Sequence, residues 1–414
     1  MKNRQFTIIE HRSLYISPSG KIEWTDGNLG IPSKDFKKIE LFITGNSEKS
    51  TQFLLPGFSR ALGHILKAQQ FVGVIETKSG ISIEILPKTA SHDLGEIRTT
   101  FLKMLKTLRS SPFKHFNMAS LNSAKMHVLE IFITMFCEEL SQLLKKGIKS
   151  DYITTSNNST FLKGKLKLSD HLRKNAIHRE RFFVEFDEYQ TDRIENRIIR
   201  TTLDLLYNRS QYNRNKKRLR EFLFVFDAVT PITDLNKSFS LIQKNRQMRD
   251  YGVVLDWCKI LLSSESVTPF RGSSIAFALL FDMNLIFEDY VATCLRRNNP
   301  NSEIQTQVGT KYLIEEPKKE FKLKPDILIG DNIVADTKWK LLESGQPHNG
   351  ISQSDIYQMY AYGKKYHAKE IILIYPYTPS FPAITETVYQ FDDHTTLQIK
   401  AFDCRLGDFY TSSV

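Results

Sequence analysis

Two carboxylates and a lysine are closely spaced around a short turn in the last third of the sequence. Pro325-Asp326 precedes one short β-branched run, and Asp336-Thr337-Lys338 ends a second run after the turn Gly330-Asp331-Asn332. Two acids that face each other repel unless a cation lies between them. Mg²⁺ prefers oxygen ligands and keeps several waters for a phosphate substrate. Because a nearby lysine can orient a water or offset charge on phosphorus, the pattern indicates metal-dependent phosphoryl chemistry.

The length of the turn decides whether these three side chains meet. With a three-residue loop at Gly330-Asp331-Asn332, Asp326 opposes Asp336, and the alternation of side chains puts Lys338 on the same face. A two-residue loop without a bulge would separate Asp326 from the other two. The alternative to a site is a surface hairpin with scattered charges. The apolar residues of both arms favour buried strands, at whose ends charges are costly unless they are used or paired.

Helices are expected on both sides of this hairpin. Residues 275–295 form a mainly apolar run that we predict as one long helix carrying Glu288, and Gln358 lies on a helix that follows the hairpin. Three tyrosines of the second helix could stack on a nucleic acid, although aromatic side chains on a helix more often belong to the core. They are Tyr357, Tyr360 and Tyr362.

The sequence before residue 266 predicts a different architecture. Residues 71–76 and 81–85 alternate around the turn Lys78-Ser79-Gly80, which is typical of a β-hairpin. Residues 154–160 are predicted as a polar loop, and residues 161–168, with lysines between apolar positions, as a strand with a cationic face. Residues 190–262 are expected to be mostly helical.

These patterns predict a multidomain protein of the α+β or α/β class. The expected parts are a β-rich N-terminal domain, a mainly helical region with a basic loop or strand insertion, and a C-terminal α/β domain that contains the hairpin. Their bounds are 1–95, 96–265 with the insertion at 150–180, and 266–414, and a connection is expected at 263–269.

Composition narrows the class of partner and the compartment. Lys plus Arg number 57 against 46 Asp plus Glu in 414 residues, a net charge of +11 that favours a polyanion such as nucleic acid. The four cysteines form no Cys-x-x-Cys pair, so we expect reduced thiols in a cytoplasmic protein rather than a zinc site. The N-terminus has no apolar signal segment, and the charges within Met126–Leu144 argue against a membrane span.

The C-terminal motifs resemble those of a known superfamily. Pro325-Asp326, followed by Asp336-Thr337-Lys338, resembles the PD-(D/E)xK nuclease signature, and Glu288 lies where that superfamily places an additional acid. The Gln358 and Tyr362 pair is similar to its Gln-x-x-x-Tyr element. More narrowly, several segments between residues 70 and 375 resemble the McrC family, the nuclease subunit of McrBC-type restriction systems. They are Glu84–Lys88, Phe161–Leu166, Asp192–Arg197, Ala335–Lys340 and Ser354–Tyr362.

The resemblance implies a restriction-endonuclease-like α/β domain with a central mixed sheet. It also implies an Mg²⁺-dependent deoxyribonuclease, with Mn²⁺ able to substitute. It implies catalytic roles for Asp326, Asp336, Lys338, Glu288 and Gln358, and metal-ligand roles for Asp326, Asp336 and Glu288. Two partners are implied: a McrB-like AAA+ GTPase hexamer, bound and stimulated through the N-terminal region, and double-stranded DNA at the nuclease domain. No membrane partner is expected.

Two other functions compete with this one. The first is a non-catalytic adaptor that only docks on and stimulates an NTPase ring, and the second is a free-standing DNA repair nuclease. An adaptor would usually have lost one of Asp326, Asp336 and Lys338, which are all present. The long N-terminal region fits partner binding better than a free-standing nuclease. The chain has no G-x-x-x-x-G-K-S/T pattern, so we expect any nucleotide hydrolysis to belong to the partner.

Overall fold

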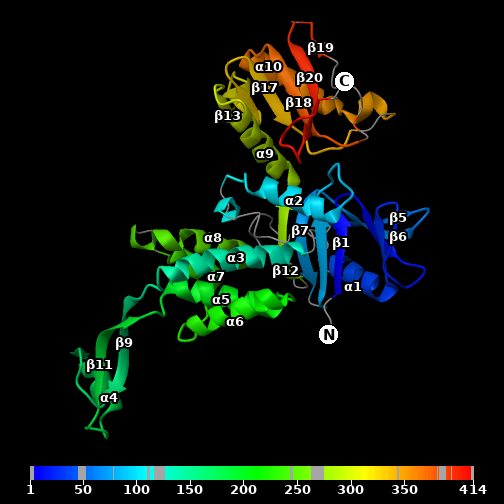
Figure 1. Cartoon of the computed structure of the whole chain (residues 1–414). Helices are drawn as coiled ribbons and strands as arrows, with labels where there is room; N and C mark the ends of the chain where they lie inside the picture. The colour runs from blue at the N-terminus through cyan, green and yellow to red at the C-terminus, as the bar shows by residue number, and fades with distance from the viewer. Residues whose placement is uncertain are drawn as a thin grey trace. The chain divides into compact units, whose positions relative to one another are not determined.

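The chain divides into two compact units in its computed structural model (Figure 1), one formed by residues 1–128 and 267–414 and the other by residues 129–266. The structure describes residues 4–44, 53–77, 79–109, 112–115, 126–242, 246–262, 275–342, 345–379, 381, 388–392 and 394–411. The connection expected at 263–269 lies outside the described residues. The division into three domains at residues 95 and 265 stays a prediction.

A small mixed sheet begins the first unit. Its strand order is β3-β4-β2-β6-β5, in which β2 is parallel to β4 and the other pairs are antiparallel. The strands are β2 (Ser13–Ile16), β3 (Glu23–Thr25), β4 (Asn28–Ile31), β5 (Leu54–Ser59) and β6 (Gly63–Ala68). Helix α1 (Ser33–Thr44) contacts β2 and buries Phe36, Ile39 and Ile43.

A second sheet takes a strand from far along the chain. Its order is β1-β8-β7-β12, with β1 parallel to β8 and the other pairs antiparallel. The strands are β1 (Arg4–Ile9), β7 (Phe71–Thr77), β8 (Ile81–Leu86) and β12 (Ile275–Asp282), and helices α2 (Leu94–Leu105) and η2 (Pro112–His115) follow β8. The β7–β8 hairpin confirms the prediction, although Lys78 of its turn lies outside the described residues.

The prediction of one helix over residues 275–295 is wrong for its first eight residues, which form β12. Only α9 (Met283–Asn298) is helical, and the Asp282 side chain caps its start by accepting a hydrogen bond from the first turn. Gly73 of β7 has φ +136°, and a Cβ there would lie 2.0 Å from the Leu279 carbonyl oxygen. The strand is therefore fixed by a close backbone approach from β7, whereas an apolar run alone fits a buried strand or a buried helix equally well.

The second unit is mainly helical, as expected for residues 190–262. Its helices are α3 (Val128–Lys145), α5 (Ile194–Arg209), α6 (Asn213–Val225), α7 (Leu235–Ser240), η4 (Arg246–Tyr251) and α8 (Gly252–Leu262). The apolar run of residues 126–144 becomes α3, whose side chains are largely buried. Among the described helices, none combines the length and the apolar character that a bilayer span requires.

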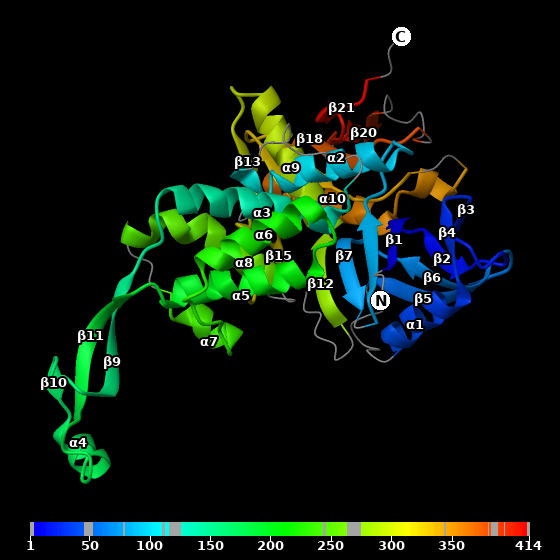
Figure 2. The same cartoon turned by 60° about the horizontal axis from the view of Figure 1, so that its bottom comes forward.

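Residues 151–190 form an extension of the second unit that we call the arm. Strands β9 (Asp151–Ser159) and β11 (Phe182–Gln190) pair antiparallel along their whole length, and Figure 2 shows α4 (Leu168–Lys174) at their far end. The polar loop predicted at 154–160 is therefore wrong, because cross-strand pairing makes this Thr- and Ser-rich segment a strand. The strand predicted at 161–168 is reduced to β10 (Lys165–Leu166).

Asn196 holds together the two chain segments from which the arm begins and ends. Its Nδ2 donates to the backbone oxygens of Lys149 at 3.0 Å and Thr191 at 2.7 Å, one on each side of the arm. Asp192 accepts hydrogen bonds from Arg197 and from Thr230. These contacts give Asp192 and Asn196 a structural role around the start of α5.

The C-terminal sheet is mixed, as predicted. Its order is β13-β16-β17-β18-β20-β19, with β21 also on β20, and β17, β18 and β20 are parallel to one another. The strands are β13 (Ile304–Thr306), β16 (Ile327–Ile329), β17 (Ile333–Thr337), β18 (Glu370–Pro376), β19 (Val388–Gln390), β20 (Thr396–Asp403) and β21 (Asp408–Phe409). Helix α10 (Gln353–Tyr366) covers β17 and β18 through Met359 and Tyr362. The remaining elements are β14 (Lys311–Ile314), β15 (Glu320–Leu323) and η5 (Pro347–Gly350).

Candidate active site

The β16–β17 hairpin has the odd-length turn that the site requires. Ile329 pairs with Ile333, so Gly330-Asp331-Asn332 form a three-residue loop. The first loop residue has φ +55°, a left-handed conformation that glycine adopts without strain. Asp326 lies just before β16 and Asp336 lies near the end of β17, and because these strands are antiparallel the two acids meet at one end of the hairpin.

Hydrogen bonds from β17 hold the Asp326 side chain. Its Oδ2 accepts from the backbone N–H and from the hydroxyl of Thr337, both at 2.8 Å. Its backbone carbonyl accepts from the Gln307 N–H at 3.0 Å. Burial raises the pKa of Asp326, and the hydrogen bonds from Thr337 and the charge of Lys338 oppose that rise. The orientation of this carboxylate is therefore set by the neighbouring strand.

Asp336 is buried beside both Asp326 and Lys338. It is 2% exposed, and its Oδ2 lies 2.6 Å from Lys338 Nζ. Burial and the nearby Asp326 carboxylate raise the pKa of Asp336 to about 7, even though the lysine opposes the shift. The Lys338 ammonium therefore offsets only part of the cost of ionising Asp336, and a further cation at this end of the hairpin would favour the ionised form.

A chain of hydrogen bonds positions Lys338. Its Nζ donates to Gln358 Oε1 at 3.0 Å, Gln358 Nε2 donates to Tyr362 Oη at 2.8 Å, and that hydroxyl donates to the Lys324 carbonyl at 3.2 Å. Burial alone would lower the pKa of Lys338, but the Asp336 carboxylate outweighs it and raises the pKa. Lys338 therefore stays protonated near neutral pH and contributes a positive charge rather than a base.

Glu288 lies on α9, close to this group but with partners of its own. Gln307 Nε2 donates to Glu288 Oε1, and Arg109 Nη2 lies 3.3 Å from the same oxygen. Burial and the charge of Asp326 raise the pKa of Glu288 to about 7. Glu288 is thus within electrostatic reach of Asp326, while Gln307 and Arg109 hold its carboxylate. Sequence reasoning missed Arg109 and Gln307, because no motif marks either residue.

The donor set fits a hard divalent cation. Asp326 and Asp336 offer carboxylate oxygens at one place, and burial raises the pKa of both, so a cation there would favour their ionised forms. Mg²⁺ is usually held by one or two carboxylates together with waters and substrate phosphates. Within the described residues, no three His, Cys, Asp or Glu side chains come together as a complete ligand set.

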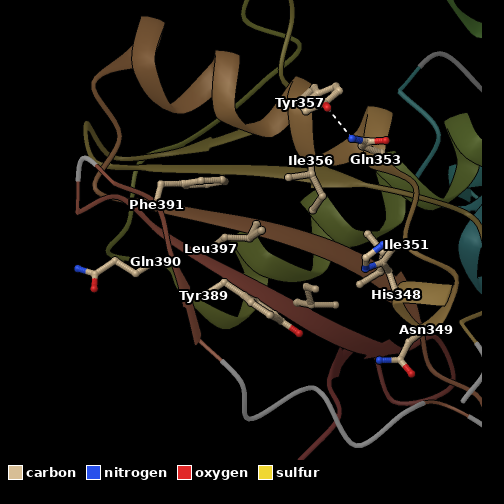
Figure 3. Close-up of a pocket in the computed structure, with 11 residues that line it drawn as sticks. His348, Asn349, Ile351, Gln353, Ile356, Tyr357, Tyr389, Gln390, Phe391 and Leu397 are labelled. Carbon is tan, nitrogen blue, oxygen red and sulfur yellow. Dashed lines mark hydrogen bonds between the residues drawn. The ribbon is translucent and has the colours of Figure 1, made fainter.

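A pocket of about 540 Å³ lies beside α10, away from the two acids (Figure 3). Tyr357 lines it, hydrogen-bonded to Gln353, and is 64% exposed, whereas Tyr362 is 4% exposed. The assignment of these tyrosines to the core therefore holds for Tyr362 and is wrong for Tyr357. The other lining residues are His348, Asn349, Ile351, Ile356, Tyr389, Gln390, Phe391, Leu397 and Ile399. Because it contains no acid, the pocket is not part of the candidate metal site.

The raised pKa of Asp336 predicts a pH dependence of stability. An unfolded aspartate has a pKa near 3.9, so between about pH 4 and 7 the folded chain holds a proton that the unfolded chain has lost. We expect the free energy of unfolding to fall as the pH rises through this window when no divalent ion is present. Asp336→Asn should reduce the fall by about 2 kcal/mol, measured by urea unfolding at pH 5 and pH 8 with chelator.

The matched control is Asp331→Asn, which changes an exposed acid of the same hairpin and should leave the fall unchanged. Adding Mg²⁺ should reduce the fall in the wild type and not in Asp336→Asn. An equal fall in the wild type and in Asp336→Asn would contradict a raised pKa for this residue.

The fold and the site define a multidomain α+β protein. Its mixed C-terminal sheet brings two aspartates, one of them buried, and a lysine together at one end of a hairpin. The profile of the family described as "McrBC 5-methylcytosine restriction system component" matches residues 66–376, more than half of the chain. The chain belongs to this family. The resemblance to the McrC family that its motifs predict is confirmed.

Individual relatives are more distant. The "Type IV methyl-directed restriction enzyme EcoKMcrBC" of Escherichia coli K12 is 21% identical over 139 residues, which are 33% of this chain and only 40% of that relative's length. A chain of a half-complex from a tetradecameric assembly of Thermococcus gammatolerans McrB AAA+ hexamers with bound McrC has a TM-score of 0.67 and 22% identity, covering 96% of this chain and 94% of that one. A chain of the cryo-EM McrBC complex of that organism has a TM-score of 0.47 and 22% identity, covering 71% and 88%. The tetradecameric assembly thus contains a chain that shares this fold over nearly its whole length.

Proposed function

We propose that this chain is the endonuclease subunit of a McrBC-like restriction system and hydrolyses phosphodiester bonds of double-stranded DNA with Mg²⁺. The observation that carries the proposal is the convergence of Asp326, Asp336 and Lys338 at one end of the β16–β17 hairpin. A buried acid, a partly buried acid and a protonated lysine suit a phosphate substrate with a divalent cation. They fit a general structural protein poorly because buried charges are costly to retain. Membership of a restriction-system family supports the same conclusion.

Each residue has a distinct part in the proposed reaction. Asp326 and Asp336 would hold the ion, which supplies charge to the scissile phosphate and lowers the pKa of a bound water. Lys338, kept protonated by Asp336, orients the attacking water or offsets negative charge on the phosphate. Gln358 fixes the lysine through its 3.0 Å hydrogen bond. Glu288 would complete the surroundings of the ion, and Gln307 and Arg109 also engage its carboxylate.

The proposed partner is a McrB-like AAA+ GTPase ring. The solved assembly that contains a chain of this fold is described as McrB AAA+ hexamers with bound McrC. The second unit offers a surface for such a partner, because the arm exposes large apolar side chains that unbound proteins usually bury. We assign ring binding to residues 1–265 and cleavage to the C-terminal sheet.

One experiment separates this function from its two competitors. The chain is incubated with GTP, Mg²⁺, methylated or unmethylated plasmid, and a McrB-like AAA+ GTPase from the same organism. We expect cleavage only when both proteins and Mg²⁺ are present, with activity retained in Mn²⁺ and lost with chelator. Stimulated GTP hydrolysis without cleavage of either plasmid would identify an adaptor. Cleavage at an equal rate without the ring would identify a free-standing nuclease.

A further inference from the structure

A buried contact joins two N-terminal strands to the residue that follows Lys338. Trp339 Nε1 donates to Glu10 Oε2 at 2.7 Å, and Lys88 Nζ donates to the Trp339 carbonyl at 3.1 Å. All three of these contacting residues are less than 9% exposed. Glu10 directly follows β1 and Lys88 lies just beyond β8, the parallel neighbour of β1. The residues that follow two adjacent strands therefore both hydrogen-bond to Trp339 of the C-terminal half.

Glu10 and Lys88 depend on each other inside the fold. Glu10 Oε1 lies 3.8 Å from Lys88 Nζ, and Glu10 Oε2 accepts from the Lys88 backbone N–H at 3.4 Å. His11 Nε2 also faces Glu10 Oε1, at 3.3 Å. Replacing a buried ion pair by apolar residues is often neutral or stabilising, so such a pair is weak evidence of a stabilising role. Glu10 accepts a hydrogen bond from the Trp339 ring, and Lys88 donates one to the Trp339 carbonyl. Because both members of the pair bind Trp339, the contact indicates that the pair fixes the position of this residue.

Trp339 connects Glu10 and Lys88 to both sides of the candidate site. Its backbone directly follows Lys338, whose N–H donates to the Ile374 carbonyl at 2.9 Å. Its ring packs on Phe287, with 5.1 Å between the ring centroids, and Phe287 precedes Glu288 in α9. A displacement of Trp339 would therefore disturb both Lys338 and Glu288.

We propose that Glu10 and Lys88 form a positioning pair for Lys338, acting through Trp339. The inference rests on the proposed nuclease function, and it assigns a role to Lys88, whose segment Glu84–Lys88 the reaction itself does not use. Neither residue touches the acids in this arrangement. They set the place of the lysine from outside the site, so their loss should slow the chemical step without weakening the binding of DNA.

Steady-state cleavage by the complete complex tests this proposal. Glu10→Gln keeps the shape of the side chain but leaves Lys88 without its counter-charge, and we expect kcat to fall about 10-fold with KM and ring GTPase stimulation unchanged. Trp339→Phe keeps the ring on Phe287 and removes the N–H donor, with a similar expected fall. Because both variants break one chain of contacts, the double variant should lose little more than either alone.

The control is Asp35→Asn, which also removes a buried carboxylate from the N-terminal half. Asp35 pairs with Arg4 rather than with a residue of the C-terminal half. The kcat values of the two variants are compared at temperatures equally far below their melting temperatures. This comparison separates a loss of positioning from a general loss of stability. An equal loss of kcat in Asp35→Asn and Glu10→Gln, or a rise in KM alone, would overturn the proposal.

A second readout does not require cleavage. The chain has three tryptophans, so 5-fluorotryptophan labelling gives a resolvable ¹⁹F spectrum in which Trp339 is identified by Trp339→Phe. Lys338→Met should shift the Trp339 resonance, and Glu10→Gln should alter that shift. Additive effects of the two substitutions on the Trp339 resonance would refute the coupling between Glu10 and Lys338. Absence of DNA cleavage by the wild type would count against the nuclease function alone.

Discussion

We expect Asp336→Asn to lower the rate of DNA cleavage by the complete complex about 10³-fold, while stimulation of the ring GTPase should stay within twofold of the wild type. The substitution keeps the size of the side chain and removes one of the two carboxylates that face each other at the end of the hairpin. Without that charge, Asp326 alone offers a weaker place for Mg²⁺. Lys338 also loses the partner that lies 2.6 Å from its Nζ.

Cleavage and GTP hydrolysis are measured on the same samples, so that assembly with the ring is checked directly. Asp331→Asn is the matched control, because it changes an exposed aspartate at the other end of the same hairpin and should leave both activities unaltered. Isothermal titration with Mg²⁺ should show weaker binding for Asp336→Asn only. Full cleavage by Asp336→Asn would remove the catalytic assignment, whatever the behaviour of the ring.

We expect removal of the arm to abolish stimulation of the ring GTPase, so that the rate should return to that of the ring alone. The deletion covers residues 152–189 and joins Asp151 to Gln190 through two glycines. These two residues oppose each other in the β9–β11 register, so a short link can close the gap without straining the helices. Asn196 still fastens the base through Lys149 and Thr191.

The physical reason is the apolar surface that the arm exposes. Phe161 is 77% exposed and Ile177 is 89% exposed, and exposed apolar side chains grouped on one element mark interaction sites. The same group includes Tyr152, Leu162, Leu168, Leu172 and Tyr189. A partner surface that covers them would supply most of the binding free energy through burial.

Pull-down with the ring and GTP hydrolysis measure the effect of the deletion, and the melting temperature checks that the rest of the chain is intact. As a control, Thr154→Ala and Asp187→Ala remove a polar pair on the arm that makes its own 2.7 Å hydrogen bond, and they should change stimulation little. If the shortened chain still stimulates the ring fully, the ring-binding surface lies elsewhere in residues 1–265.

Local sequence patterns were sufficient for the centre of the candidate site. Alternation with period two and a loop of three residues place Asp326 opposite Asp336, and the observed register of Ile329 with Ile333 agrees with that geometry. The β7–β8 hairpin followed from a similar short-range signal. In each case the determining interactions lie within about ten residues of one another, which is why a single sequence predicts them.

Contacts between distant segments were decided only by the tertiary structure. Residues 275–282 have the apolar character of a helix, yet the close approach of Gly73 to Leu279 makes them a strand of the N-terminal sheet. The partners of Glu288 and of Trp339 likewise come from segments that no local pattern connects, namely Arg109 for the first and Glu10 for the second. A sequence pattern records the face that a residue presents, and the partner on that face is fixed only when the whole chain packs.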